Sequence, residues 1–260
     1  MNENLCSIII PMYNCAKTIC HAIQSVQNQT YNNLEILAVD DHSSDSTDDI
    51  VKNMAENDNR IHIIKNETNL GVAESRNRGF KQAKGNYVAL LDSDDIWEPD
   101  KLKEQIAILK KTGNDFCYTS YSYISDSGDE IGIPRIVPNV CTYSSLLKEN
   151  FLCCSSVLLR SELTQNHKMT NEFFHEDFVY WLELLKSGYT AVGCGQVLVK
   201  YRISRNGKSS DKTTSAKHRW QVYREYCKMN VAESLYYFSC YTFHGLKKYR
   251  KMADELAAKN

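Results

Sequence analysis

The sequence of 260 residues lacks any uninterrupted apolar run of the roughly 18–20 residues that a membrane-spanning helix requires. It also lacks a basic segment ahead of its first apolar run, which Met1-Asn2-Glu3-Asn4 precedes directly, so we expect no cleaved signal peptide. Internal repeats and low-complexity segments are absent. The apolar and charged fractions, 42% and 24%, are ordinary for a globular protein, and the length allows one large domain with an appendage.

No two cysteines are spaced as CxxC, the pair that begins many zinc sites. The ten cysteines are scattered, and several lie in apolar runs, where a thiol serves as a small hydrophobe. The adjacent pair Cys153-Cys154 is too isolated to define a zinc site. We therefore expect reduced thiols and a cytoplasmic protein.

The formal net charge of −1 conceals an uneven distribution of charge. Residues 199–260 contain fourteen Lys and Arg against five Asp and Glu, whereas the preceding residues contain seventeen against twenty-seven. Such a division predicts two surfaces with different partners.

The first half of the chain alternates apolar runs with helical apolar stripes. The runs predict strands over residues 7–10, 34–39, 61–64 and 87–91, and the stripes between them predict helices. This alternation predicts an α/β fold with a mostly parallel sheet and helices on both faces.

The second half of the chain has a looser pattern. Beyond Phe116 we expect shorter strands, a turn at residues 126–129, and a helix over about residues 176–186. From about Thr214 the sequence predicts a helical, aromatic-rich tail.

Residues that could contact a ligand follow three of the predicted strands, at the edge where parallel strands place ligands. They are Pro11, Tyr13 and Asn14 after the first strand, Asp40 and Asp41 after the second, and Asp92, Ser93, Asp94 and Asp95 after the fourth. Carboxylates gathered at one edge repel each other unless a cation or hydrogen-bond donors offset the charge. Oxygen ligands suit Mg²⁺ or Mn²⁺, although each aspartate taken alone is equally well explained as a helix cap.

Four motifs in this order resemble family 2 glycosyltransferases, which have the GT-A fold. They are Ser7-Ile-Ile-Ile-Pro-Met-Tyr-Asn14, Gln29-Thr-Tyr31, Glu35 through Asp41, and Leu91-Asp-Ser-Asp-Asp95, and the resemblance covers roughly residues 5–205. It implies a nucleotide-sugar donor, usually linked to UDP, a divalent metal, and inversion at the anomeric carbon.

The resemblance also implies roles for residues of the first half. Pro11 and Tyr13 would border the nucleotide base, with Tyr13 stacked beside it, and Asp41, with Asp40 as the less certain match, would accept a hydrogen bond from the base. Asp92-Ser93-Asp94 matches the DxD motif, with Asp92 directed toward the ribose and the metal and Asp94 as metal ligand.

Arg76 follows Asn69-Leu-Gly71 in a pattern that resembles the loop and helix beside the nucleotide. The resemblance implies a contact of Arg76 with the base or the diphosphate, and the alternative is an arginine on a helix surface. In the second half, His175-Glu176-Asp177 matches an acidic pair, which makes Asp177 the general base. The alternative for Asp177 is a helix cap.

The segment from Tyr201-Arg202 to Lys208 resembles the lid after the last strand. Ser204 stands where the family often has a histidine, which leaves the third protein ligand of the metal open. Arg202, Arg205 and Lys208 are candidate diphosphate contacts, with a solvated basic loop as the alternative. Trp181 is expected in the core rather than against a sugar.

The tail combines basic and aromatic residues, a composition typical of interfacial helices on anionic lipid. The alternative is a helix that packs its aromatic residues on the catalytic domain. No recognisable nucleic-acid-binding module accompanies it, so we expect no nucleic-acid partner.

We therefore predict a metal-dependent, inverting glycosyltransferase that moves a sugar from a UDP-sugar to a glycan acceptor, with lipid-linked acceptors included, in bacterial surface polysaccharide synthesis. Its expected place is the cytoplasm, with peripheral contact at the inner face of the membrane. The rival interpretations are an inactive sugar-nucleotide or glycan binder and a nucleotidyltransferase. The absence of glycine from Pro11 to Ala16 disfavours the latter.

The expected organisation is a GT-A domain over residues 1–213 and the tail over residues 214–260. Within the domain, a nucleotide-binding half covers about residues 1–115 and an acceptor-binding half about residues 116–213.

Overall fold

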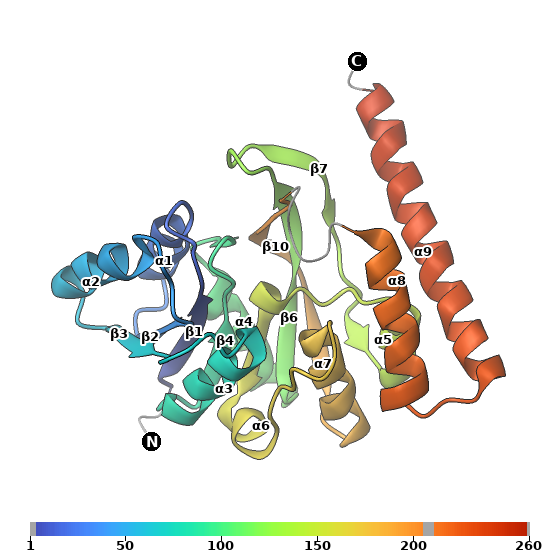
Figure 1. The fold of residues 1–260 in the computed structure, drawn as a ribbon, viewed down its shortest axis with the longest axis horizontal. Helices are drawn as coiled ribbons and strands as arrows, with labels where there is room; N and C mark the ends of the chain where they lie inside the picture. The colour runs from blue at the N-terminus through green and yellow to red at the C-terminus, as the bar shows by residue number, and fades with distance from the viewer. Residues whose placement is uncertain (1–3, 205–210, 259–260) are drawn as a thin grey trace.

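A ten-stranded sheet forms the centre of the protein in the computed structural model, which describes residues 4–204 and 211–258 (Figure 1). The strand order is β3-β2-β1-β4-β9-β6-β10-β5, with β7 paired to β6 and β8 paired to β10. The strands are β1 (Cys6–Met12), β2 (Leu34–Asp40), β3 (Ile61–Lys65), β4 (Tyr87–Leu90), β5 (Ile96–Trp97), β6 (Phe116–Ile124), β7 (Glu130–Arg135), β8 (Val140–Cys141), β9 (Val157–Arg160) and β10 (Ala191–Arg202).

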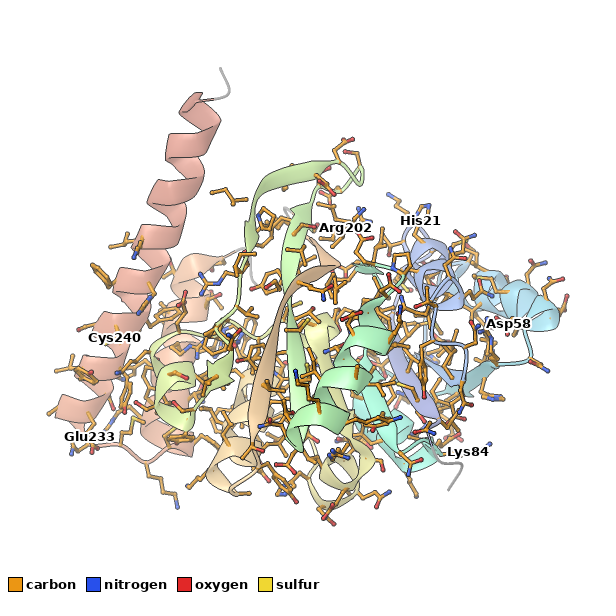
Figure 2. All side chains as sticks on the ribbon, turned by 180° about the vertical axis from the view of Figure 1, so that it is seen from behind. His21, Asp58, Lys84, Arg202, Glu233 and Cys240 are labelled. Carbon is orange, nitrogen blue, oxygen red and sulfur yellow. The ribbon has the colours of Figure 1, made fainter. Side chains whose placement is uncertain are left out.

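Helices cover both faces of this sheet. In Figure 1, α3, α6 and α7 lie in front of the strands, and in the view from behind in Figure 2, α4 lies in front of them. The helices are α1 (Ile19–Gln27), α2 (Thr47–Asn57), α3 (Val72–Gln82), α4 (Lys101–Thr112), α5 (Tyr143–Lys148), α6 (Ser161–Asn166), α7 (Glu176–Lys186), α8 (Lys212–Gln221) and α9 (Val231–Ala258), with short helices η1 (Cys154–Ser156) and η2 (Val222–Tyr226).

The predicted α/β architecture is confirmed in the first half of the chain. Strands β3, β2, β1 and β4 are parallel, and every residue of β1 is buried, as its apolar sequence predicts. Helix α3 lies so close to β1 that a Cβ on Gly79 would be 2.5 Å from Ile9 Cγ2. A larger residue than glycine at this position would therefore push α3 away from β1. The start of α3 lies beside the end of β2, where Asp41 accepts hydrogen bonds from the Leu70 and Gly71 amides.

The expectation of shorter strands beyond Phe116 is wrong for β6 and β10, although it is confirmed for β8 and β9, which have two and four residues. Strands β6 and β10, with nine and twelve residues, are the longest of those described. The length of β10 is not evident from its sequence because Gly193, Gly195 and Gln196 interrupt the apolar pattern. The pairing of β10 with β6 also shifts register on both sides of Val197. The predicted turn at residues 126–129 joins β6 to β7, with Gly128 at a φ of +92°.

The sheet is continuous across the expected boundary between the two halves. Strand β9, from the second half, runs antiparallel between β4 and β6 and joins them. At the carboxyl end of the chain, α8 and η2 lie against the domain, and α9 runs along its outer side (Figure 1). Among the described residues, no helix combines the length and apolar character needed to span a membrane.

Candidate active site at the carboxyl edge of the sheet

The carboxyl ends of β1, β2 and β4 bring three of the predicted motifs to one edge of the sheet. Pro11 is buried within β1, whereas the ring of Tyr13, just beyond the strand, is 53% exposed. An exposed aromatic face at this position can stack on a nucleobase. Two non-glycine residues nearby, Asn14 (φ 48°) and His42 (φ 66°), adopt left-handed backbone conformations, which concentrate at functional sites.

Asp40 and Asp41 organise the loops beside Tyr13. Oδ1 of Asp41 accepts hydrogen bonds from Asn66 Nδ2 (2.7 Å) and the Leu70 amide (2.8 Å), and Oδ2 accepts one from the Gly71 amide (2.8 Å). Asp40 Oδ1 accepts a hydrogen bond from the Ser43 amide at 3.2 Å. Asp41 therefore holds the loop that begins α3, and a nucleobase would compete with these donors for its oxygens.

The DxD motif follows β4, and its two aspartates are partly exposed. Burial and the neighbouring carboxylate of Asp92 raise the pKa of Asp94 to about 6. Mutual repulsion of this kind is relieved when a cation binds between the carboxylates. Ser93, between them, is also partly exposed.

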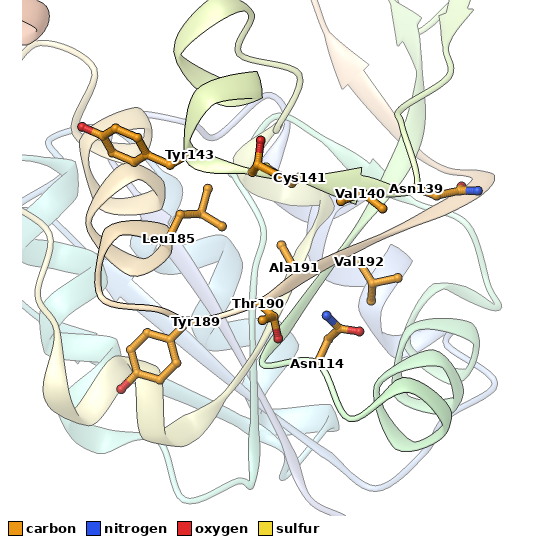
Figure 3. Close-up of a pocket in the computed structure, with 11 residues that line it drawn as sticks. Asn114, Asn139, Val140, Cys141, Tyr143, Leu185, Tyr189, Thr190, Ala191 and Val192 are labelled. Carbon is orange, nitrogen blue, oxygen red and sulfur yellow. The ribbon is translucent and has the colours of Figure 1, made fainter.

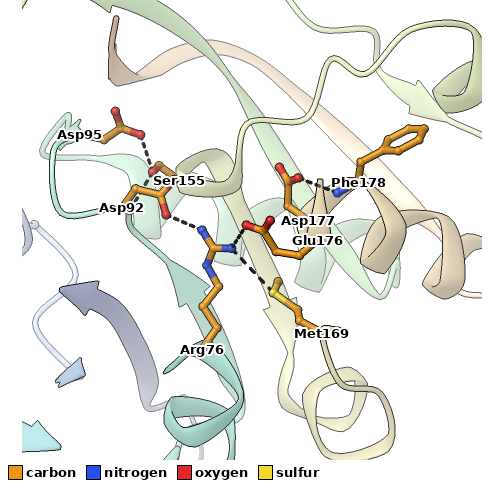
Figure 4. A network of polar contacts seen from close by, with 8 residues as sticks. All are labelled: Arg76, Asp92, Asp95, Ser155, Met169, Glu176, Asp177 and Phe178. Atoms are coloured by element: carbon orange, nitrogen blue, oxygen red, sulfur yellow. Dashed lines mark hydrogen bonds and ion pairs between the residues drawn. The ribbon is translucent and has the colours of Figure 1, made fainter. Parts of the chain in front are cut away.

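A buried network holds the DxD loop from below (Figure 4). The Ser155 hydroxyl accepts a hydrogen bond from the Asp92 amide (2.9 Å) and donates one to Asp95 Oδ2 (2.5 Å). The Arg202 amide donates to Asp95 Oδ1 at 2.8 Å. Burial, followed by the charges of Asp94 and Asp92, raises the pKa of Asp95 well above its usual value. Sequence reasoning missed Ser155, because only the fold brings it within reach of residues 60 positions away.

Arg202 lies beneath the same loop. Its Nε donates to the Asp94 carbonyl oxygen at 2.8 Å, and its Nη1 donates to the carbonyl oxygens of Ser125 and Asp126 at 2.6 and 3.1 Å. These bonds tie the DxD loop to the end of β6. The other two candidate diphosphate contacts, Arg205 and Lys208, lie outside the described residues.

Arg76 is buried between the two acidic motifs rather than exposed on its helix (Figure 4). Its Nη2 donates to Asp92 Oδ1 at 2.6 Å, and its Nη1 donates to Glu176 Oε1 at 3.0 Å. The alternative of a surface arginine is therefore wrong. Removing one partner of such a buried ion pair typically costs about 3–5 kcal/mol. The arginine thus fixes the DxD motif relative to the acidic pair at the start of α7.

Asp177 occupies the first turn of α7, beside the DxD motif (Figure 4). Its Oδ1 accepts a hydrogen bond from the Phe178 amide at 2.7 Å. Burial and the charge of Glu176 raise the pKa of Asp177 to about 6, although Arg76 opposes the shift. A carboxylate with this pKa is largely ionised at neutral pH and is a stronger base than an ordinary aspartate.

The residues present suit a magnesium or manganese ion that the substrate helps to bind. Asp92 and Asp94 provide two carboxylates, and these ions often use one or two carboxylates together with substrate phosphates. Among the described residues, no group of three or more His, Cys, Asp or Glu side chains is arranged to hold a metal.

Two cavities lie near the sheet, one at its opposite end and one beside the DxD loop. One, of about 410 Å³, is at the amino ends of β6 and β10, and its lining, which includes Asn114, Tyr143 and Tyr189, contains no charged side chain (Figure 3). The other, of about 580 Å³, lies between α1 and the β6–β7 turn and is lined by His21 and Arg202 among others (Figure 2). Trp181 fills the core, as expected, and is fully buried.

Comparison with known proteins agrees with this architecture. The profile of the family described as glycosyl transferase family 2 matches residues 7–174. A glucosyltransferase of Escherichia coli, named as UDP-Glc:α-D-GlcNAc-diphosphoundecaprenol β-1,3-glucosyltransferase, is 38% identical over 96% of both chains. A putative teichuronic acid biosynthesis glycosyltransferase of Bacillus subtilis is 36% identical over 94% of this chain and 97% of its own.

Solved structures show the same fold. A fragment of TarS from S. aureus, in complex with UDP-GlcNAc, superposes with a TM-score of 0.71 at 21% identity over 85% of this chain and 64% of that one. A mannosyltransferase from Pyrobaculum calidifontis, in complex with GDP-Man and Mn²⁺, superposes with a TM-score of 0.68 at 18% identity, over 88% of this chain and 66% of that one. The resemblance seen in the sequence motifs is thus confirmed, and the chain belongs to glycosyl transferase family 2.

Proposed function

We propose that this glycosyltransferase uses a UDP-sugar and a divalent metal and transfers the sugar, with inversion, to a hydroxyl of a lipid-linked glycan. The observation that carries the proposal is the linkage of the DxD motif to the acidic pair through Arg76, which makes both ion pairs at once. Asp92, proposed to bind the donor, and Glu176, the residue before the proposed base, thereby share one partner, which supports a donor site beside Asp177.

The donor would occupy the edge formed by β1, β2 and β4. The exposed ring of Tyr13 provides a stacking surface for the base, and the loop held by Asp41 closes the same end of the sheet. The E. coli relative is named for a UDP-glucose donor, which supports UDP as the nucleotide.

Asp94 and Asp92 would hold Mg²⁺ or Mn²⁺ against the diphosphate. When bound, such an ion neutralises the charge that develops on the leaving diphosphate. The raised pKa of Asp94 supports this assignment, because burial and the charge of Asp92 both disfavour the ionised carboxylate and a bound cation would offset that cost.

Asp177 would act as general base on the acceptor. As the acceptor oxygen attacks the anomeric carbon, its proton passes to the Asp177 carboxylate. The bond between that carbon and the diphosphate oxygen breaks, and UDP leaves with the electron pair. Attack opposite the leaving group inverts the configuration at the carbon.

The outer helix α9 would bring the enzyme to the inner face of the membrane, where a lipid-linked acceptor is anchored. Five of its apolar residues are more than half exposed: Val231, Leu235, Tyr236, Phe243 and Leu246. The end of this helix is rich in Lys and Arg. Exposed apolar side chains combined with basic ones are typical of interfacial helices on anionic lipid.

UDP release in the presence of Mn²⁺, measured with UDP-Glc, UDP-Gal and their N-acetyl forms, tests the proposal. The acceptor is a sugar diphosphate on a short alkyl chain. We expect one donor to give acceptor-dependent release, and Asp177→Asn to bind UDP as the wild type does while losing at least about 100-fold in turnover, the usual minimum for a lost general base.

Asp49→Asn is the matched control, because Asp49 is an exposed aspartate on α2, and it should keep wild-type turnover. Unchanged turnover in Asp177→Asn would remove its role as base. UDP binding without release for every donor would identify the chain as a binder instead.

A further inference from the structure

Arg219, on α8, is a buried cation that the proposed reaction does not use. Its side chain is 5% exposed, and its guanidinium carbon lies 3.5 Å from the centroid of the Phe178 ring and 5.0 Å from that of Tyr241. The guanidinium is therefore placed between α7, α8 and α9. Burial lowers the pKa of Arg219, but a guanidinium remains charged at neutral pH.

Among the side chains that the structure describes, no carboxylate forms an ion pair with Arg219, and its Nε and Nη1 are buried without a hydrogen-bond partner. Only the rings of Phe178 and Tyr241 face the guanidinium within this part of the chain. Arg76 provides the contrast, since Asp92 and Glu176 neutralise it. Burying an unpaired charge is costly, so its retention requires an explanation.

Aromatic contacts place α8 and η2 against the segment that carries Asp177. The ring centroids of Phe173 and Tyr226 are 5.7 Å apart, and those of Phe174 and His218 are 4.5 Å apart in parallel planes. Together with the contact of Arg219 on Phe178, these pairs flank His175-Glu176-Asp177 on both sides. The π-helix η2 begins three residues after Arg219, and such helices occur frequently at functional sites.

We propose that Arg219 is a positioning residue whose charge stabilises the carboxylate form of Asp177, on the assumption that Asp177 is the base of the proposed function. The opposite charge of an ion-pair partner cancels most of the electrostatic potential that a cation creates at a distance. A cation without such a partner, in a medium of low dielectric constant, therefore acts on other charges over a longer distance. A bound acceptor would cover Asp177 and favour its protonated form, which the charge of Arg219 opposes.

The other groups around the two residues are consistent with this role. Burial, the acids Glu176 and Asp92 and the cation Arg76 act most strongly on Asp177, and the two acids already offset the charge of Arg76. Arg219 acts on Asp177 more weakly than these groups. Cys154, on η1, is uncharged at neutral pH because burial raises its pKa. The side chains that most influence Arg219, apart from Asp177, are Tyr223, Tyr241 and Cys227, none of which is a carboxylate.

The pH dependence of kcat, at saturating Mn²⁺ and donor, tests the proposal. Arg219→Met should move the acid limb upward from about pH 6 by about half a pH unit, a smaller shift than that of an ion-pair partner because Arg219 acts on Asp177 through space. A shift of this size should lower kcat about twofold at pH 6 and hardly change it at pH 8. Arg219→Lys, which keeps the charge, should restore the limb, and Lys217→Met, which removes an exposed charge from the same helix, should leave it in place.

A second measurement does not depend on turnover. The ¹³C resonance of the Asp177 carboxyl, assigned by its loss in Asp177→Asn, should titrate about half a pH unit higher in Arg219→Met than in the wild type. A loss of kcat that is equal at every pH, or a titration that does not move, would overturn the proposal. If no donor is turned over at all, the proposed function fails, and the titration still decides the role of Arg219.

Discussion

Asp94 and Asp95 are adjacent in the sequence, but their carboxyl groups have different surroundings. Asp94 is partly exposed, and the repulsion of Asp92 acts on it, so it is available to a cation. Asp95 is buried and accepts hydrogen bonds from Ser155 and the Arg202 amide. We therefore interpret Asp94 as the ligand-binding aspartate and Asp95 as the residue that holds the loop.

The raised pKa of Asp94 predicts a stabilising substitution. An acid whose pKa is higher in the folded state stabilises the fold when protonated, and that stabilisation is lost as the pH rises from about 4 through about 6. In the absence of metal at pH 8, Asp94→Asn should therefore raise the free energy of unfolding by about 1–3 kcal/mol, and the gain should shrink toward pH 4.

Urea denaturation at several pH values measures this gain. The same variant should lose Mn²⁺-dependent transfer. A variant that is less stable than the wild type at pH 8, or one that transfers sugar with unchanged metal dependence, would contradict the assignment.

At the scale of elements, the basic tail divides into two parts. Val222 and Tyr223 are fully buried, and the Tyr223 hydroxyl donates to the Leu147 carbonyl oxygen at 2.6 Å, so η2 belongs to the packed domain. Helix α9 packs Tyr237 and Phe238 inward but leaves Phe243 exposed. Packing on the domain therefore describes α8, η2 and the inner face of α9, and membrane contact remains a proposal for the exposed face of α9.

Two truncations should separate these roles. Residues 1–229, which lack α9, should remain folded and transfer sugar to a short-chain acceptor while losing binding to anionic liposomes. Residues 1–210 should lose at least about 3 kcal/mol of stability, because the burial of Val222 and Tyr223 contributes about 1.5–3 kcal/mol each.

Thermal denaturation and liposome co-sedimentation measure both outcomes. The full-length variant Phe243→Ser/Leu246→Ser serves as the control for the liposome measurement. Equal liposome binding by residues 1–229 and by the full chain would leave α9 without a membrane role.

At the scale of the whole molecule, the sheet joins the two expected halves of the domain. Strand β4 pairs with β1 on one side and with β9 on the other, and β9 continues the sheet to β6. Arg76, Asp92 and Glu176 link the same halves at the active site. Neither half buries its own core without the other.

A fragment of residues 1–115 should therefore not fold cooperatively. Its β4 would expose an unpaired edge, and the helix faces that pack on the second half would be exposed to water. The fragment should show little chemical-shift dispersion in an amide NMR spectrum and no cooperative urea transition, whereas residues 1–229 should show both. A cooperative transition of the fragment would indicate an independent nucleotide-binding unit.

Local sequence patterns predicted the helices and strands that residues close together in the chain determine. The apolar runs of β1 and β2 and the stripe of α7 indicated these elements because burial imposes a period on nearby residues. The DxD motif follows a predicted strand and Asp177 lies in the first turn of a predicted helix, and the family resemblance implied the roles of both. The length of β10 was missed because its pairing with β6, rather than its own pattern, maintains the strand through Gly193 and Gly195.

By itself, the sequence determined the α/β class, the family and the position of the acidic motifs at the ends of strands, since each of these depends on residues close together in the chain. Only the tertiary structure decided what surrounds those motifs. Ser155 beneath Asp92, Arg76 between Asp92 and Glu176, and Arg219 against Phe178 are contacts between distant segments. The environment of a side chain in such a contact depends on the charge and shape of partners that are distant in the sequence, so the sequence pattern around that side chain does not predict it.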